Sequence, residues 1–128
     1  MGRNADVFRE FHAAWTAGDL PAVLALTDPD VVVRPLHGAL FTRGEFRGHD
    51  GMRDWYRELT DPWDRLEAIV ECVRDTPEGA KGVLKVVGYR GEEGLHVRVG
   101  VDVGMRDGRV LTITARNVHD VEDELAAD

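Results

Sequence analysis

The strongest constraint on the fold is a change of hydrophobic period near Trp63. Before that point apolar residues recur every three to four positions, which is typical of amphipathic helices. After it apolar and polar residues alternate, which indicates strands with two different faces. Asp107 and Gly108 stand between two alternating runs, and this pair is a strong signal for a tight β-hairpin. The sequence therefore predicts helices first and an antiparallel sheet last.

The ends of the elements follow from glycine, proline and capping residues. The predicted helices cover 4–17, a short segment after Asp19, and 49–59. The predicted strands cover 31–35, 66–75, 82–90, 95–106 and 109–119. The acidic tail 121–128 is expected to fray or to form a final helical turn. A chain of 128 residues fits one α+β domain, 1–128, with one core.

The composition excludes several classes of partner. The net charge of −8 argues against nucleic acid, because phosphate binding needs a basic stripe, and it also disfavours an anionic membrane surface. No apolar run reaches the length of a membrane span or of a signal peptide. The single cysteine, Cys72, cannot form an intrachain disulfide. A cytoplasmic location is therefore expected.

Pairing outward from a two-residue turn at Asp107 and Gly108 gives the sheet two contrasting faces. One face carries small and polar residues, namely Gly100, Asp102, Gly104, Ala115 and Asn117, together with Arg98 and Tyr89. The opposite face is rich in valine, with Val97, Val99, Val101 and Val103. Small residues beside polar ones leave space whose polar groups need partners, so the mixed face is predicted to hold a ligand pocket.

The alternative is that the valine face is the core and the mixed face meets solvent. A register slip of one residue would exchange the side chains between the faces. If the mixed face is the pocket, the valine face needs a cover. A second copy of the chain is expected to supply that cover, which predicts a homodimer through the outer face of the sheet.

Several segments resemble a known family. They are 8–26 (FREFHAAWTAGDLPAVLAL), 30–38 (DVVVRPLHG), 46–59 (FRGHDGMRDWYREL), 105–111 (MRDGRVL) and 115–125 (ARNVHDVEDEL). Together they are similar to the SnoaL-like branch of the nuclear-transport-factor-2-like superfamily, which includes polyketide cyclases and ketosteroid isomerases. The resemblance implies a cystatin-like cone, in which three N-terminal helices pack in the concave face of a curved antiparallel sheet. Most characterised members use no cofactor, so the resemblance implies none here.

The resemblance also suggests catalytic residues. Asp102 matches a strand carboxylic acid that donates a hydrogen bond to an oxyanion in the isomerases, although an ionised Asp102 paired with an arginine is the alternative. Arg34 and Phe11 stand where isomerases have their base and their tyrosine, so steroid isomerisation is not expected. Arg34 is predicted to anchor an anionic oxygen, or else to form a salt bridge. His37 is the candidate general base, with a plain surface role as its alternative.

The remaining candidates are residues that would contact a ligand. They are Phe11, Trp15, Trp55, Tyr89, Arg98 and Asn117. His12 lies at the rim of the first helical stripe, where packing is favoured over ligand contact. His96 and His119 are expected to meet at one end of the sheet, but two such residues without a third ligand do not predict a metal site.

The leading hypothesis is a cofactor-independent acid/base enzyme, a cyclase, isomerase, dehydratase or hydrolase, that acts on a small hydrophobic substrate. The alternatives are a non-catalytic protein that binds a similar ligand and a structural dimerisation module. A fold of this kind hosts many activities, so the site has to decide between them.

Overall fold

A computed structural model describes residues 2–35 and 44–127 of the chain. The helices are α1 (Arg3–Thr16), α2 (Leu20–Ala25), α3 (Gly48–Thr60) and α4 (Val118–Ala127). The strands are β1 (Thr27–Arg34), β2 (Phe46–Arg47), β3 (Arg65–Asp75), β4 (Gly79–Arg90), β5 (Glu93–Arg106) and β6 (Arg109–Arg116). They form one sheet in the order β2-β1-β6-β5-β4-β3.

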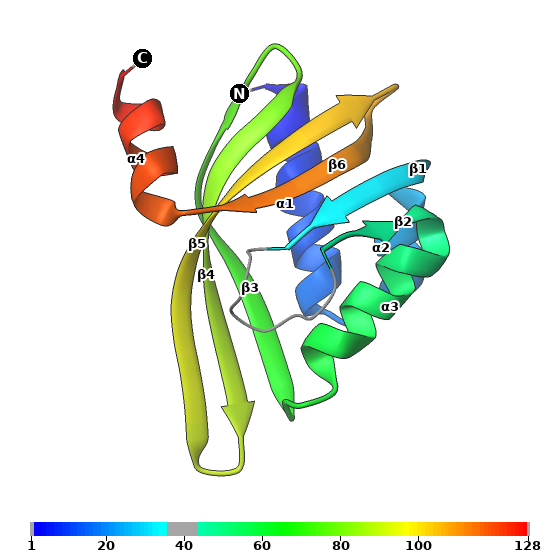
Figure 1. Cartoon of the computed structure of the whole chain (residues 1–128), viewed down its shortest axis with the longest axis vertical. Coiled ribbons are helices and arrows are strands. Elements are labelled where there is room, and N and C mark those ends of the chain that lie inside the picture. Colours follow the sequence, from blue (N-terminus) through cyan, green and yellow to red (C-terminus); the bar gives the residue numbers. More distant parts are fainter. Residues whose placement is uncertain (1, 36–43, 128) are drawn as a thin grey trace.

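The sheet is strongly twisted, with α1, α2 and α3 on one side and α4 on the other (Figure 1). The predicted α+β architecture, with three N-terminal helices packed on a curved sheet, is confirmed. One detail differs, because β1 runs parallel to β6 while every other neighbouring pair is antiparallel. The sheet is therefore mixed.

The helices begin and end where local chemistry predicts. Gly18 adopts a positive φ of 74° just after α1, a conformation that costs glycine little. The Asp19 carboxylate then accepts a hydrogen bond of 3.1 Å from the Ala22 amide and so caps α2. Phe8, Phe11 and Trp15 recur on one face of α1, and all three are buried in the core.

The Asp107–Gly108 hairpin has the predicted geometry only near its turn. Both residues have a positive φ, and Arg106 lies opposite Arg109 as expected. Further along, Met105 pairs with Val110 and Gly104 pairs with Thr112, which leaves Leu111 as an extra residue on β6. Pairing outward from the turn without a bulge would place Gly104 opposite Leu111, and this β-bulge shifts the register by one position, so that prediction is wrong.

Beyond the bulge, each side chain of β6 lies on the face of the sheet opposite to the predicted one. Ile113 and Ala115 lie opposite Val103 and Val101, and so they join the valine face. That face packs against the helices, with Val101 and Val103 buried in the core. The predicted orientation of the sheet is therefore wrong, because burying the aliphatic side chains removes more apolar surface from water.

This correction also weakens the argument for a subunit interface. The valine face packs against the chain's own helices where Val101 and Val103 are buried, and its end near the β4–β5 turn stays open, with Val97 41% exposed. The homodimer stays a prediction, but a wholly uncovered valine face is no longer a reason for it.

The acidic tail forms a full helix. α4 lies on the face of the sheet opposite α1, and its Val121 is completely buried there, near Gly100 of β5. Asn117, predicted to contact a ligand, instead accepts a hydrogen bond of 2.9 Å from the His119 amide at the start of this helix. None of the helices described for residues 2–35 and 44–127 is long and apolar enough to cross a lipid bilayer.

Candidate functional site

A cavity of about 470 Å³ lies on the valine face of the sheet, against α1 and α3. Aromatic and aliphatic side chains make up nearly all of its wall. From the helices, the segment after α3 and the residue that follows β1 come Trp15, Trp55, Leu59, Trp63 and Pro35. From the strands come Leu66, Ala68, Leu84, Val86, Leu95, Val97, Val99, Val101, Ile113 and Ala115, and the other two wall residues in the described part of the chain are His12 and Arg98. A wall of this composition suits an apolar ligand.

The helix that carries Trp15 is fixed to the sheet at its C-terminal end. The Thr16 hydroxyl accepts a hydrogen bond of 2.9 Å from the Ala68 amide and lies 3.2 Å from the Ala68 carbonyl oxygen. The ring of Trp15 lies 6.2 Å from that of Trp55, between centroids, and so links α1 to α3. These contacts join α1 to β3 and to α3 beside the cavity.

The absence of a side chain at Gly88 makes room for the ring of Trp63. A Cβ atom added to Gly88 of β4 would lie 2.9 Å from the Trp63 indole, so only a residue without a side chain lets the ring rest on the strand. The Arg90 guanidinium carbon lies 5.2 Å from the centre of the same ring. All three tryptophans of the chain thus line the cavity.

His12 is the imidazole in this wall. Its Nδ1 lies 2.8 Å from the carbonyl oxygen of Phe8, and because a carbonyl only accepts, Nδ1 carries the hydrogen and donates it. Nε2 is then left with a free lone pair. Burial lowers the pKa of His12 to about 4, a fall that the Phe8 hydrogen bond only partly opposes, so the ring is neutral near pH 7.

The structure gives His12 a larger role than the sequence predicts. It packs against the rings of Phe8 and Phe11, with centroids 4.5 and 5.1 Å away, and it also lines the cavity. The signal is present in the spacing. Positions 8, 11, 12 and 15 follow the i, i+3, i+4, i+7 pattern, which places His12 on the buried stripe itself rather than at its rim.

The other predicted ligand contacts divide into two groups. Trp15, Trp55 and Arg98 lie in the cavity wall. Phe11 is buried in the core, and Tyr89 is 46% exposed near the β4–β5 turn. The Arg98 guanidinium binds Glu71 at 2.8 Å and Glu122 at 2.9 Å, so its charge is already neutralised.

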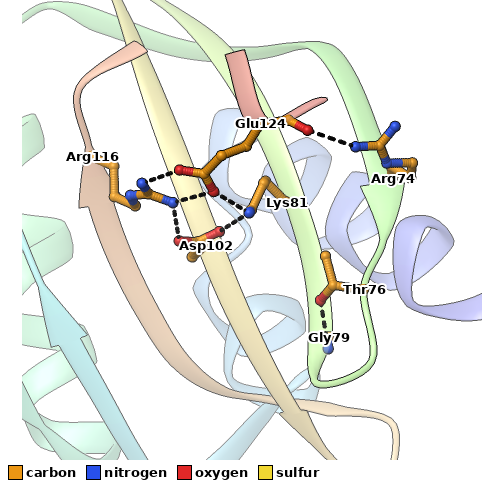
Figure 2. A network of polar contacts seen from close by, with 7 residues as sticks. All are labelled: Arg74, Thr76, Gly79, Lys81, Asp102, Arg116 and Glu124. Carbon is orange, nitrogen blue, oxygen red and sulfur yellow. Dashed lines mark hydrogen bonds and ion pairs between the residues drawn. The ribbon is translucent and has the colours of Figure 1, made fainter. Parts of the chain in front are cut away.

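Asp102 does not face the cavity, so the predicted position of this carboxylate is wrong. It lies on the outer face of the sheet, 2.8 Å from Arg116 and 3.9 Å from Lys81 (Figure 2). This is the alternative in which an ionised Asp102 pairs with an arginine. A carboxylate is costly to bury among apolar groups, which favours the outer face for Asp102.

Arg34 is also outside the cavity wall. Its Nε lies 3.2 Å from a carboxylate oxygen of Glu45, and its side chain is half exposed, which matches the salt-bridge alternative. Its neighbour Pro35 does line the cavity. His37, the predicted general base, lies outside the described residues.

The outer face carries a network that fastens α4. Glu124 of α4 binds both Arg116 of β6 and Lys81 of β4, and its backbone carbonyl accepts a hydrogen bond of 3.4 Å from Arg74 (Figure 2). Arg74 also donates a hydrogen bond of 2.9 Å to the Leu125 carbonyl. The hydrogen bonds from Arg116 and Lys81 lower the pKa of Glu124 to about 2. A polar hollow of about 370 Å³ lies beside this network, with Lys81 and Asp102 among its lining residues. These groups already bind one another, so the network is explained by the docking of α4.

Metal binding finds no support in the part of the chain that the structure describes. No group of three histidine, cysteine or acidic residues there could hold a metal ion. His96 lies opposite Val87, whereas His119 belongs to α4. The predicted meeting of His96 and His119 is wrong, because the pairing of β6 with β5 ends at Arg116.

Comparisons with known proteins identify the family. The family model described as SnoaL-like domain matches residues 8–128. The chain belongs to this SnoaL-like family. No curated protein matches this SnoaL-like chain.

Solved structures share the fold of this SnoaL-like chain at low sequence identity. Bal32a, from a soil-derived mobile gene cassette, has a TM-score of 0.81 and 20% identity, with 95% of each chain covered. TerC, co-crystallised with polyporic acid, has a TM-score of 0.80 and 14% identity over 99% of this chain and 100% of its own. An NTF2-like protein from Burkholderia pseudomallei has a TM-score of 0.79 and 19% identity over 98% and 97%. At these identities the likeness shows the fold alone.

Proposed function

We propose that this SnoaL-like protein binds a small, mainly apolar molecule in the cavity on the valine face and acts on it by acid/base chemistry without a cofactor. The observation that carries the proposal is a neutral imidazole, His12, in a wall whose other described residues are almost all apolar. The volume of about 470 Å³ is in the range of small-molecule pockets. The co-crystal of TerC with polyporic acid supports a small organic ligand for this fold.

His12 would act through Nε2. A neutral imidazole accepts a proton from an acidic C–H or O–H group of a bound molecule and later returns it. The hydrogen bond from Nδ1 to the Phe8 carbonyl holds the ring in the required tautomer. Asp102 and Arg34, the acid and the anion anchor expected from the sequence, have no part in this proposal because both lie outside the cavity wall.

The alternative is a protein that binds the same kind of molecule without changing it. One observation favours it. A pKa of about 4 makes His12 a weak base at neutral pH, and an imidazolium formed in an apolar cavity would be poorly solvated. The reacting group would therefore have to be unusually acidic, or the ligand would leave unchanged.

A ligand screen with two matched variants tests the binding part. Uncharged apolar molecules should raise the melting temperature of the unmodified protein. Ala115→Phe, which places a ring inside the cavity, should abolish the effect. Thr114→Phe changes the neighbouring residue on the outer face and should preserve it. If no molecule stabilises the protein, or if Ala115→Phe leaves the shifts intact, the proposal is wrong.

Mass spectrometry of each bound molecule after long incubation tests the catalytic part. Conversion by the unmodified protein that is lost in His12→Gln, while binding persists, would support the acid/base role. Recovery of every bound molecule unchanged would support the binding protein instead.

A further inference from the structure

We infer that the cavity selects uncharged molecules that carry a hydroxyl group on an apolar body, and that this hydroxyl donates its hydrogen to Nε2 of His12. The inference rests on the proposed function, since it concerns the same cavity. It adds the chemical class of the ligand and the atom that recognises it.

His12 has a hydrogen-bond acceptor, Nε2, that the described residues leave unused. The residue is only 5% exposed, and its Nδ1 is committed to the Phe8 carbonyl. No partner for Nε2 is found among residues 2–35 and 44–127. Among these residues the fully buried side-chain atoms without a partner are the indole nitrogens of Trp15 and Trp55, so Nε2 of His12 opens on the cavity and lacks the hydrogen bond that a protein donor would give it. A ligand hydroxyl in the cavity would restore that bond.

The described part of the wall disfavours charged ligands. No aspartate or glutamate is found among the described residues of the wall, so a ligand ammonium has no counter-charge there. The guanidinium of Arg98 is already bound by Glu71 and Glu122, so within the described part of the wall a ligand carboxylate has no free cation either. Moving an unpaired charge out of water into an apolar wall is strongly unfavourable.

The cavity should also distinguish ligands that donate a hydrogen bond from ligands that only accept one. An ether or a ketone has no hydrogen to give to Nε2, so it would leave the imidazole unpaired. The indole nitrogens of Trp15 and Trp55 also lack partners among the described residues, but both atoms are buried beneath the cavity surface. They therefore offer no ready donor to a ligand acceptor, and the preference should go to the hydroxyl compound.

Isothermal titration calorimetry with three compounds on one ring system tests the inference. 2-Naphthol carries the hydroxyl, 2-methoxynaphthalene replaces its hydrogen with a methyl group, and 2-naphthoate carries a charge. The unmodified protein should bind 2-naphthol about tenfold more tightly than 2-methoxynaphthalene, as expected when a buried acceptor gains a partner. It should not bind 2-naphthoate measurably.

Two histidine variants show whether His12 is the source of the preference. In His12→Phe the two neutral compounds should bind with affinities within about twofold of each other, because the acceptor is gone. His96→Phe replaces an exposed histidine on the outer face and should keep the original preference. Equal binding of the two neutral compounds by the unmodified protein, tight binding of 2-naphthoate, or a preference that persists in His12→Phe would each overturn the inference.

A measurement on the unmodified protein tests the inference even if His12→Phe fails to fold. The ¹⁵N resonance of His12 Nε2 should move when 2-naphthol is added and should move much less with 2-methoxynaphthalene. A resonance that stays in place at saturation with 2-naphthol would also overturn the inference, while the proposed function would stand because the cavity is occupied. If none of the naphthalene compounds and no molecule of the wider screen binds, the proposed function fails and the inference with it.

Discussion

Gly100 of β5 lies directly beneath Val121 of α4. A Cβ atom added at Gly100 would lie 2.4 Å from Cγ2 of Val121, which is far inside the contact distance of two carbon atoms. Val121 is fully buried at this point, so the absent side chain of one residue makes room for the other. The contact explains how a short acidic helix stays on the outer face of the sheet.

Gly100→Ala should therefore displace α4 and destabilise the protein by roughly 1–3 kcal/mol, the usual cost of overpacking. Urea unfolding measures the loss. The double variant Gly100→Ala/Val121→Ala should be more stable than the sum of the two single changes predicts, because the smaller side chain relieves the clash. Strict additivity would show that the two residues are not in contact.

The buried state of His12 should make stability depend on pH. Its pKa falls from 6.5 to about 4 on folding, so the unfolded chain takes up the proton first. Stability should then decrease as the pH falls from about 6.5 to about 4, by roughly 3 kcal/mol in total. Urea unfolding at several pH values measures this, and His12→Phe should lack the decrease. Parallel pH profiles for His12→Phe and the unmodified protein would contradict the assignment.

Glu124 should hold α4 in place through Arg116 and Lys81. Glu124→Gln removes the negative charge and should speed amide hydrogen exchange within α4, with little effect on β3 and β4. Asp123→Asn removes a charge from an exposed neighbour in the same helix and is the matched control. Because the pKa of Glu124 is lowered to about 2, its contribution should persist above about pH 4.5 and disappear as the pH falls toward 2. Equal exchange in the two variants would show that the network does not hold the helix.

The three tryptophans should report on the cavity. A saturated ligand such as 1-adamantanol absorbs no light in their range, and its binding should protect them from quenching by acrylamide. Ala115→Phe, with its narrowed cavity, should show no added protection at the same ligand concentration. Unchanged quenching of the unmodified protein, at a concentration where calorimetry shows saturation, would place the ligand elsewhere.

The bulge at Leu111 should depend on a side-chain hydrogen bond. The Thr112 hydroxyl accepts a bond of 3.0 Å from the Gly104 amide at the point where the register shifts. Thr112→Val removes this acceptor and should cost roughly 1 kcal/mol of stability, measured by urea unfolding. Thr114→Val, two residues further along the same face, removes a hydroxyl without such a bond and should cost less.

The sequence by itself determined the three N-terminal helices, most of the strands and the family, but not the short strand β2 or the full extent of α4. The helical stripe of Phe8, Phe11 and Trp15 and the hairpin at Asp107 and Gly108 depend on local rules, namely the period of the apolar residues and the backbone freedom of a turn. Both lie where the sequence predicts them. The same local patterns carry the family resemblance, so helices packed on a curved sheet are already implied by the order of the residues.

Only the tertiary structure decided which face of the sheet holds the site. The bulge at Leu111 moved Ala115 to the valine face, and no single turn or period predicts an extra residue in mid-strand. The packing of α1 then buried His12 beside the cavity and lowered its pKa, while Asp102 stayed on the outer face with Arg116. Burial and charge pairing depend on contacts between segments far apart in the chain, and these appear only when the chain is folded.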